Sequence, residues 1–302
     1  MRRTIYPALL AAALVAAPAA ADEGDYPNDL AANDDAIVLQ PISPWNIDFG
    51  ENRCRLTRVF GSAEDQHLLY FEQAAPGSNF GMTLAGSQVR PFTNARRLYI
   101  GMERDETMRL RERFARGDVA GVGPAVILTS IGISSGGPED TPQDALRSAG
   151  IDLAEAETAD RIVLQRSGRV LSFETGNMMP PFQALNTCTK DLLRDWGLDP
   201  EQHAAYYPPR WSNQRTLARR LQQQYPSDAL RAGEQGIFRL RVIVEADGTV
   251  SDCHLEESTE MDRLESPACR EMRRARFEPA RDVEGNPMRS FYATTISYSL
   301  GG

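Results

Sequence analysis

A stretch of alternating apolar and polar side chains near the C-terminal end, residues 237–246, constrains the fold more than any other part of the sequence. Alternation with a period of two is typical of a β-strand that buries one face. The apolar set is Phe238, Leu240, Val242 and Val244, and the polar set is Arg239, Arg241 and Glu245. Asp247-Gly248 comes next and precedes a second extended stretch, residues 249–258. Asp-Gly between two strands predicts a hairpin with a type I′ turn, which needs positive φ at both central residues.

The segments around this hairpin predict two helices and one more strand. Leu264, Ala268 and Met272 are four residues apart and therefore share one face of a helix. Residues 216–223 are expected to begin the other helix, and residues 289–300 alternate again as a final strand. We therefore predict a small α+β domain in which a three-stranded antiparallel sheet packs on two helices.

This segment resembles the C-terminal domain of the TonB family. The residues that carry the resemblance are Tyr225-Pro226, Ala229-Leu230-Arg231, Gly236, Leu240-Arg241-Val242, Asp247-Gly248-Thr249-Val250 and Arg276-Phe277-Glu278-Pro279-Ala280. They are dispersed but occur in the order of the family, and they cover about residues 215–302. The resemblance implies the fold predicted above and a domain that binds other proteins.

In TonB-type domains a short peptide of an outer-membrane receptor pairs with an exposed edge of the sheet. Such β-strand addition draws affinity from main-chain hydrogen bonds and selectivity from pockets for alternate side chains. The resemblance therefore implies a binding edge along the last strand, with residues 224–226 nearby. The partner-binding residues that it implies are Gln224, Tyr225, Pro226, Phe291, Tyr292, Thr294, Ile296 and Tyr298. The alternative is that this strand is only a folding element with a covered edge; an open edge would also allow homodimers.

The first residues have the organisation of a secretory signal peptide. Arg2 and Arg3 precede a run rich in Ala, Leu and Val, and Ala19-Ala20-Ala21 offers a small-residue cleavage site. We predict that residues 1–21 are removed on export across the inner membrane, which makes the protein periplasmic. The alternative is an uncleaved membrane anchor, although the run between Pro7 and Pro18 is shorter than the roughly 20 apolar residues that a span needs.

The middle of the chain predicts a second, larger domain. Residues 22–36 are acidic and poor in large apolar side chains, as in a disordered leader. Residues 37–200 contain several short apolar or alternating runs, which favour a β-rich N-terminal domain of unknown function. Residues 201–214 are expected to be a connector, and residues 215–302 are the C-terminal domain.

Two helices are expected within the N-terminal domain. Residues 106–116 are highly charged and predict a surface helix. Residues 182–196 predict an amphipathic helix, because apolar side chains recur at near-helical spacing. That stripe consists of Leu185, Cys188, Leu192 and Trp196.

The four cysteines of an exported chain favour disulfide bonds. Four cysteines allow three connectivities. We expect Cys253–Cys269, which would join the second hairpin strand to the helix that follows it, and Cys54–Cys188 within the N-terminal domain. The alternative is a set of unpaired, buried thiols.

Charge and motifs argue against several other functions. The net charge of −9 disfavours nucleic acid and anionic lipid as partners. The histidines are scattered and no Cys-x-x-Cys pair occurs, so we expect neither a metal ion nor another cofactor. Residues 132–136 match the Gly-x-Ser-x-Gly elbow of serine hydrolases, but Gly136-Gly137-Pro138 stands where the motif needs a helix. We therefore assign no catalytic residue.

Three functional hypotheses remain. The preferred one is a non-enzymatic periplasmic protein that binds a protein partner, such as a TonB-dependent outer-membrane receptor, through the edge of the C-terminal sheet. The second is a membrane-anchored energy transducer for TonB-dependent transport, although a globular domain stands where such a transducer has a long Pro-rich linker. The third is a serine hydrolase that uses Ser134.

Overall fold

The structure, a computed structural model, describes most of the chain from residue 36 onward. The described residues are 36–102, 108–111, 114–133, 145–147, 150–257 and 266–298. The predicted signal peptide, the leader up to residue 35 and Ser134 of the hydrolase motif lie outside the described residues.

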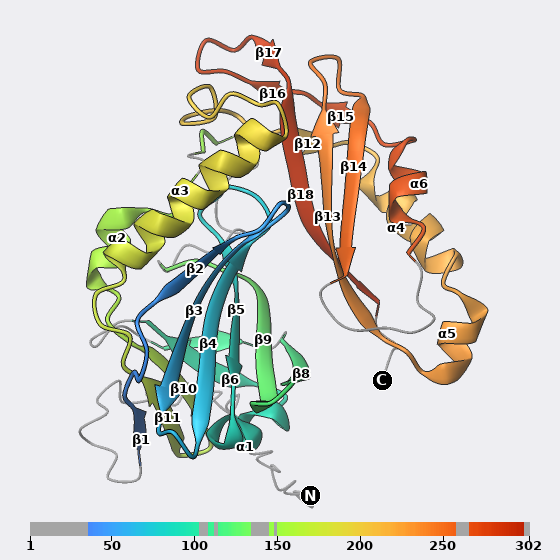
Figure 1. The fold of residues 1–302 in the computed structure, drawn as a ribbon. Coiled ribbons are helices and arrows are strands. Elements are labelled where there is room, and N and C mark those ends of the chain that lie inside the picture. The colour runs from blue at the N-terminus through green and yellow to red at the C-terminus, as the bar shows by residue number, and fades with distance from the viewer. Residues whose placement is uncertain are drawn as a thin grey trace, which may run out of the picture.

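The N-terminal domain contains two sheets that share one core (Figure 1). The larger sheet has six strands, and all of its neighbouring strands are antiparallel. Its strand order is β2 (Asn46–Phe49), β3 (Cys54–Gly61), β4 (Gln66–Gln73), β5 (Phe80–Ala85), β9 (Gly123–Ile131) and β8 (Ala115–Val119). Alternate side chains of these strands, such as Leu56 and Phe60 of β3, are buried in the core.

The smaller sheet packs on the other side of this core. Its order is β1 (Ile37–Leu39), β11 (Arg169–Phe173), β10 (Ile162–Arg166), β6 (Leu98–Gly101) and β7 (Arg109–Arg111). Only the pairing of β1 with β11 is parallel. The rings of Phe60 and Phe173, from the two sheets, meet edge to face with centroids 5.3 Å apart. The short helices α1 (Arg90–Thr93) and α2 (Leu153–Thr158) complete the domain together with α3.

Helix α3 (Met179–Asp195) closes the open side of the core, as its apolar stripe predicts (Figure 1). Phe182 lies 5.0 Å from Phe71 and 5.1 Å from Phe80, measured between ring centroids. Cys188 is bonded to Cys54 of β3, so the predicted disulfide is confirmed and joins the helix to the larger sheet. The bond closes a sequence separation of 134 residues, for which the chain-entropy model gives about 5 kcal/mol of stabilisation.

The prediction of a helix at residues 106–116 is wrong for the described part of that segment. Strand β7 pairs with β6, with Leu110 opposite Tyr99, and β8 begins at Ala115. The Arg and Glu residues of this segment favour a helix by propensity. Strand formation depends on cross-strand neighbours more than on propensity, and β6 supplies the ladder here.

The C-terminal domain is the predicted α+β unit (Figure 1). Its antiparallel sheet has the order β14 (Val250–Glu257), β13 (Gly236–Val244) and β18 (Ser290–Tyr298). One face is covered by α4 (Gln214–Gln223) and α6 (Ala268–Met272), which pack on Leu240 and Val242. A further helix, α5 (Ser227–Ala232), lies between α4 and β13 in the chain. Cys253 of β14 is bonded to Cys269 of α6, which confirms the second predicted disulfide.

The connector pairs with the C-terminal domain at two places. Strand β12 (Arg210–Trp211) pairs with β15 (Phe277–Glu278), and Tyr207 exchanges backbone hydrogen bonds of 2.8 and 3.0 Å with Arg281. Arg281 belongs to β16 (Ala280–Arg281), which pairs with β17 (Pro287–Met288) within the same domain.

The hairpin at Asp247-Gly248 forms as predicted, but its turn is not type I′. Of its residues only Gly248 has a positive φ, 81°, which fits a three-residue loop with glycine in the left-handed position. A Cβ on Gly248 would lie 2.0 Å from the carbonyl oxygen of Phe277. The close approach of β15 therefore requires glycine here in addition to the turn.

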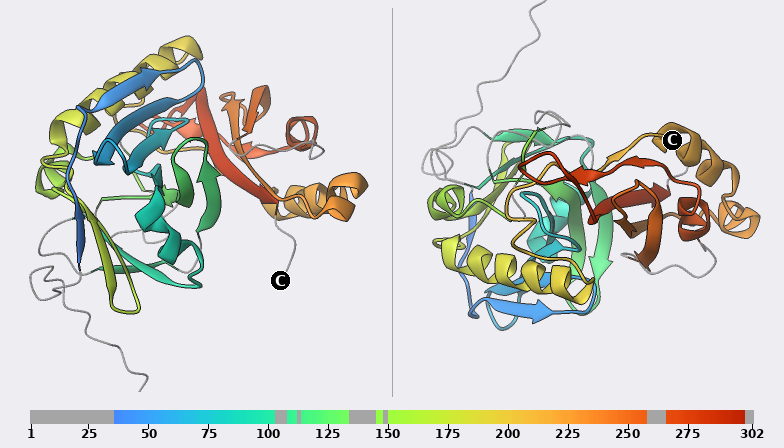
Figure 2. Two further views of the ribbon diagram at one scale, coloured as in Figure 1. Left: turned by 60° about the horizontal axis from the view of Figure 1, so that its bottom comes forward. Right: turned by 90° about the horizontal axis from the view of Figure 1, so that it is seen from above.

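Strand β13 is buried on both faces, whereas its alternating pattern predicts burial on one. Arg241 and Ile243 belong to the face away from the helices and are only 8% and 1% exposed. Ile243 is part of the same apolar cluster as the N-terminal core. The N-terminal domain therefore covers the sheet face opposite the helices (Figure 2).

Candidate functional site

The sheet of the C-terminal domain ends at β18. Its residues pair with β13 along its whole length, from Ser290 opposite Val244 to Tyr298 opposite Gly236. Within the described residues, the backbone of β18 hydrogen-bonds to no strand on its other side. In an antiparallel ladder every second residue directs its N–H and C=O away from the partner strand. Strand β18 therefore presents unpaired backbone donors and acceptors along its outer edge.

The side chains of β18 are uncharged throughout, with the sequence Ser-Phe-Tyr-Ala-Thr-Thr-Ile-Ser-Tyr. Edge strands usually carry charges or prolines that discourage pairing with another chain. Ala293 and Ser297 are exposed, and residues 294–296 between them are half-buried. Residues 293–297 are thus the accessible part of this edge.

The predicted residues 224–226 lie near the end of β18, where they fix neighbouring elements. The ring of Tyr225 meets the ring of Tyr298 edge to face, with centroids 5.3 Å apart. The Tyr225 hydroxyl donates to the carbonyl oxygen of Glu234. Pro226 is half-buried and directly precedes α5. Tyr225 thereby links Tyr298, the last residue of β18, to the segment directly before β13.

Gln224 is held by α6. Its Nε2 donates to Oε1 of Glu271 at 3.1 Å, and its own side-chain oxygen accepts from Arg270 at 3.0 Å. Glu271 is 3% exposed, and the side-chain hydrogen bond from Gln224 is the main cause that lowers its pKa. The structure therefore gives Gln224 a role inside the domain.

The remaining predicted side chains of β18 divide between its two faces. Tyr292 faces the helices, with its ring centroid 5.8 Å from Trp211 and 5.2 Å from Phe277, and burial raises its pKa. Ile296 packs on the same side, and Tyr298 contacts Phe238 at 5.5 Å. By alternation Thr294 shares this face.

Phe291 lies on the opposite face, against the N-terminal domain. Its ring centroid is 5.7 Å from that of Trp196, and its exposed fraction is 5%. The side chain of Phe291 is therefore enclosed within the protein, although its backbone remains part of the strand edge.

Glu72 of β4 joins the two domains through ion pairs. Its carboxylate is 1% exposed, and Arg55 binds Oε2 through Nε at 2.7 Å and Nη2 at 2.5 Å. Arg239 of β13 binds the other carboxylate oxygen. Arg53 bridges onward to Glu256 of β14 at 2.5 Å. A buried carboxylate is tolerated only with such partners, so the two domains complete one charge network between them.

A second contact between the domains is aromatic. The guanidinium of Arg241 lies 4.4 Å from the ring centroid of Trp196. His203 of the connector is buried, and its Nδ1 donates to the carbonyl oxygen of Asp199 at 2.8 Å. Its Nε2 therefore accepts from the hydroxyl of Ser290 at 3.0 Å when the ring is neutral. Burial lowers the pKa of His203 below its usual 6.5 and outweighs the opposing effect of Asp199.

Glu72, Trp196 and His203 were not predicted from the sequence as interface residues. No local signal could have found them, because Arg239 and Arg241 at alternate positions of the strand predict a solvated face. The sequence offers no way to locate those partners, which come from distant segments.

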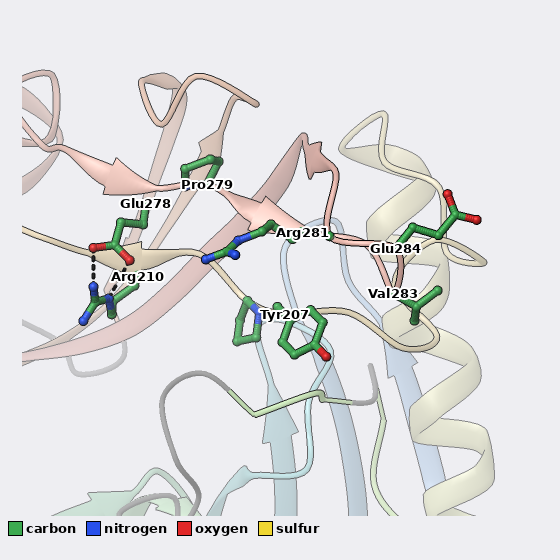
Figure 3. A pocket seen from close by; sticks show the side chains of 9 residues that line it. Tyr207, Arg210, Glu278, Pro279, Arg281, Val283 and Glu284 are labelled. Carbon is green, nitrogen blue, oxygen red and sulfur yellow. Dashed lines mark hydrogen bonds and ion pairs between the residues drawn. The ribbon is translucent and has the colours of Figure 1, made fainter.

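An open groove of about 710 Å³ lies between the connector and the segment that contains β15 and β16 (Figure 3). Tyr207 and Pro208 of the connector form one side, and residues 278–285 form the other. Arg210 and Glu278 pair with each other across it. Its two arginines and two glutamates balance, so its lining has no net charge that would select an ionic ligand.

In the described part of the chain, no helix is long and apolar enough to cross a membrane. No group of three or more His, Cys, Asp or Glu side chains is placed there to hold a metal ion.

Comparison with known proteins identifies the part of the chain that contains β18. Residues 222–300 match the family model described as Gram-negative bacterial TonB protein C-terminal. No curated protein and no solved structure matches the chain. Domains of this family interact with proteins such as outer-membrane receptors. The match includes all three strands of the sheet and the segment 224–226. Residues 222–300 of this chain are therefore a TonB C-terminal domain.

Proposed function

We propose that the protein is a periplasmic, non-enzymatic TonB-like protein that binds a protein partner by β-strand addition at the outer edge of β18. A TonB-dependent outer-membrane receptor is the first candidate partner, because TonB C-terminal domains interact with such receptors. The binding surface consists of the backbone edge of residues 293–298, with Tyr225 at its end.

The observation that carries this proposal is the uncharged, unpaired edge of β18. An added strand would gain main-chain hydrogen bonds from every second residue of β18, and no like charge would oppose it. The side chains of Tyr292 and Phe291 are occupied within the protein, so they support the position of the edge and leave its backbone to the partner.

The disulfides support export of the protein. Disulfides form and persist in oxidising compartments such as the bacterial periplasm. Both pairs, Cys54–Cys188 and Cys253–Cys269, join a strand to a helix within one domain, as expected for structural bonds. Together with the signal-like residues 1–21, they favour a protein that works outside the cytoplasm.

Two neighbouring proline substitutions, Thr294→Pro and Thr295→Pro, test strand addition. Adjacent residues of β18 direct their N–H groups to opposite sides, so one proline removes a donor to β13 and the other removes an outward donor. Thr294→Pro, which removes the donor to β13, should destabilise the fold. Thr295→Pro, which removes the outward donor, should leave the melting temperature nearly unchanged and abolish capture of the partner from an envelope extract by the full-length protein.

Ser251→Pro on the opposite edge is the matched control, because it alters an edge strand without touching β18. Capture that persists in folded Thr295→Pro would remove strand addition at this edge as the mode of binding. Fractionation of cells tests the compartment: mature protein that begins near Asp22 in the soluble periplasm is expected, and full-length protein in the inner membrane would contradict the proposal.

A further inference from the structure

Strand β18 meets the larger sheet of the N-terminal domain through Thr295, which lines a small cavity together with residues of β5 and β9. We propose that a shelf on β8 and β9 forms the second wall of the partner-binding site and selects an extended peptide with small, uncharged side chains at alternate positions. We define this shelf as Ala115, Gly117, Ile127 and Thr129. The inference rests on the strand addition proposed above and names the peptide class that it would accept.

The contacts between the two sheets follow the same order in both. Strand β14 contacts the turn before β3 through Glu256 and Arg53, and β13 contacts β4 through Arg239 and Glu72. Thr295 of β18 lines a small cavity together with β5 and β9 residues that include Thr83 and Thr129. The series β14, β13, β18 therefore lies over the series β3, β4, β5–β9. A partner strand added beyond β18 would therefore lie over β9 and β8. Strand β8 is the last strand of the larger sheet.

The shelf side chains belong to the face of the larger sheet that meets the C-terminal domain. Val126 and Leu128 point into the N-terminal core, so Ile127, which lines the cavity, points the other way. Ala115 is paired directly with Ile127, and Gly117 with Ala125, which places both on the Ile127 side.

Accessibility and size suit this shelf to a bound peptide. Gly117 and Thr129 are exposed, and Ala115 and Ile127 are half-buried. The Cδ1 atom of Ile127 lies 3.0 Å from the position that a Cβ on residue 117 would take. Glycine at this position therefore lets the Ile127 side chain lie close to the backbone of β8. The cavity beside Thr295 is small, with a volume of about 30 Å³.

The shelf would read the added strand through alternate side chains. Every second side chain of that strand would point at the shelf across the spacing of two packed sheets, about 10 Å. A charged side chain there would lose its hydration against Ala, Gly, Ile and Thr without gaining a partner. The other half of the interface offers Glu72 and Arg239, but these two groups already neutralise each other. Small, uncharged side chains at alternate positions are therefore favoured.

Selection from a phage-displayed library of random ten-residue peptides on the full-length protein tests the inference. The expected peptides carry Gly, Ala, Ser, Thr or Val at alternate positions and compete with one another. Thr129→Glu should weaken their binding by more than about tenfold, which corresponds to about 1.4 kcal/mol. The matched control Thr187→Glu makes the same change at an exposed site on α3 and should leave binding unchanged.

The outcomes separate this inference from the proposed function. Peptides that depend on β18, as judged by the two proline variants, but that bind Thr129→Glu as tightly as the original chain would overturn the shelf and leave strand addition standing. A library that yields no β18-dependent peptide would overturn both. Thr129→Lys, judged by the same criterion, replaces the Glu variant if that protein fails to show the original melting temperature.

Discussion

The two edges of the C-terminal sheet differ in charge and in anchoring. Strand β14 carries Asp252, His254, Glu256 and Glu257, whereas β18 carries no charged side chain. On β14, Asp252 pairs with Arg241 at 3.4 Å and Glu256 pairs with Arg53, and Cys253 is bonded to α6. Strand β18 is anchored at its first two residues and at Tyr298, and it is accessible from Ala293 to Ser297.

This difference shows how one sheet can have a protected edge and a binding edge. Charges on an edge strand oppose pairing with a second chain, and an uncharged edge lacks this protection. An uncharged edge is a hazard for self-association unless it has a partner. The N-terminal domain holds the sheet from one face and leaves the edge of β18 unpaired in the described structure. The predictions that follow weaken the anchors of each edge in turn.

Removal of the aromatic anchor of β18 should have the largest effect. Phe291→Ala deletes a ring that contacts Trp196, His203 and Tyr206 and is 5% exposed. Deletion of a buried phenylalanine ring costs about 3–5 kcal/mol because it leaves a cavity. Urea unfolding should show this loss, while Ser297→Ala on the exposed part of the same strand should change the free energy of unfolding by less than about 0.5 kcal/mol. Equal effects of the two changes would mean that β18 is not anchored at its first residues.

Removal of the covalent anchor of β14 should have the next largest effect. The double variant Cys253→Ser with Cys269→Ser opens a loop with a sequence separation of 16 residues. The chain-entropy model gives a loss of about 3 kcal/mol. When only this bond is reduced in the original chain, its melting temperature should fall to that of the variant. A variant as stable as the oxidised protein would show that packing of α6 suffices to hold β14.

The charge network should contribute less, because its arginines are partly solvated. Glu72→Gln leaves Arg55 and Arg239 facing a neutral amide, and the exposed fractions of their side chains are 31% and 22%. We expect the free energy of unfolding, measured with urea, to fall by about 2 kcal/mol, which is less than the roughly 3–5 kcal/mol lost when a fully buried ion pair is broken. Glu257→Gln on the exposed end of β14 is the control, with an expected change near zero. A neutral outcome for Glu72→Gln would mean that the domains are held by apolar contacts alone.

The smallest effect concerns pH and the connector. Because burial lowers the pKa of His203 in the folded chain, the unfolded chain takes up a proton first as the pH falls. The contribution of His203 is therefore fully present above pH 6.5, the usual value, and declines below it. Chemical unfolding at pH 7.5 and at pH 5.5 should show this decline, and the decline should be smaller in His203→Asn. An identical pH dependence in the variant would show that other groups cause it.

Local patterns in the sequence were sufficient for the three-stranded sheet of the C-terminal domain, but helix α5 was not predicted. The Asp247-Gly248 hairpin, the last strand and the Cys253–Cys269 bond depend on spacing within short segments. The Cys54–Cys188 bond was predicted because Cys188 lies on the apolar stripe of its helix. The turn type was wrong because Asp-Gly also suits a three-residue loop, in which only the glycine takes a positive φ. The close approach of Phe277 to Gly248, from far along the chain, is likewise not visible in the local pattern.

The burial of the polar face of β13 could not be predicted from its own residues. Arg239 and Arg241 at alternate positions indicate a solvated face, and their burial depends on Glu72 and Trp196. These two partners lie in separate elements of the N-terminal domain, and no pattern links them to β13. For the same reason the shelf on β8 and β9 could not be recognised, since Ala115 lies at the end of a segment that favours a helix by propensity and Gly117 directly follows that segment.

Residue-resolved amide hydrogen exchange on the full-length protein, alone and with its captured partner, tests the central claim most directly. Without partner, alternate amides of residues 293–298 should exchange rapidly, while those of β13 stay protected by pairing on both sides. With partner, the rapid amides of β18 should become slow and those of β14 should not change. Uniformly slow exchange along β18 in the protein alone, or protection by the partner that is confined to β14 or to the groove beside Tyr207, would contradict the claim.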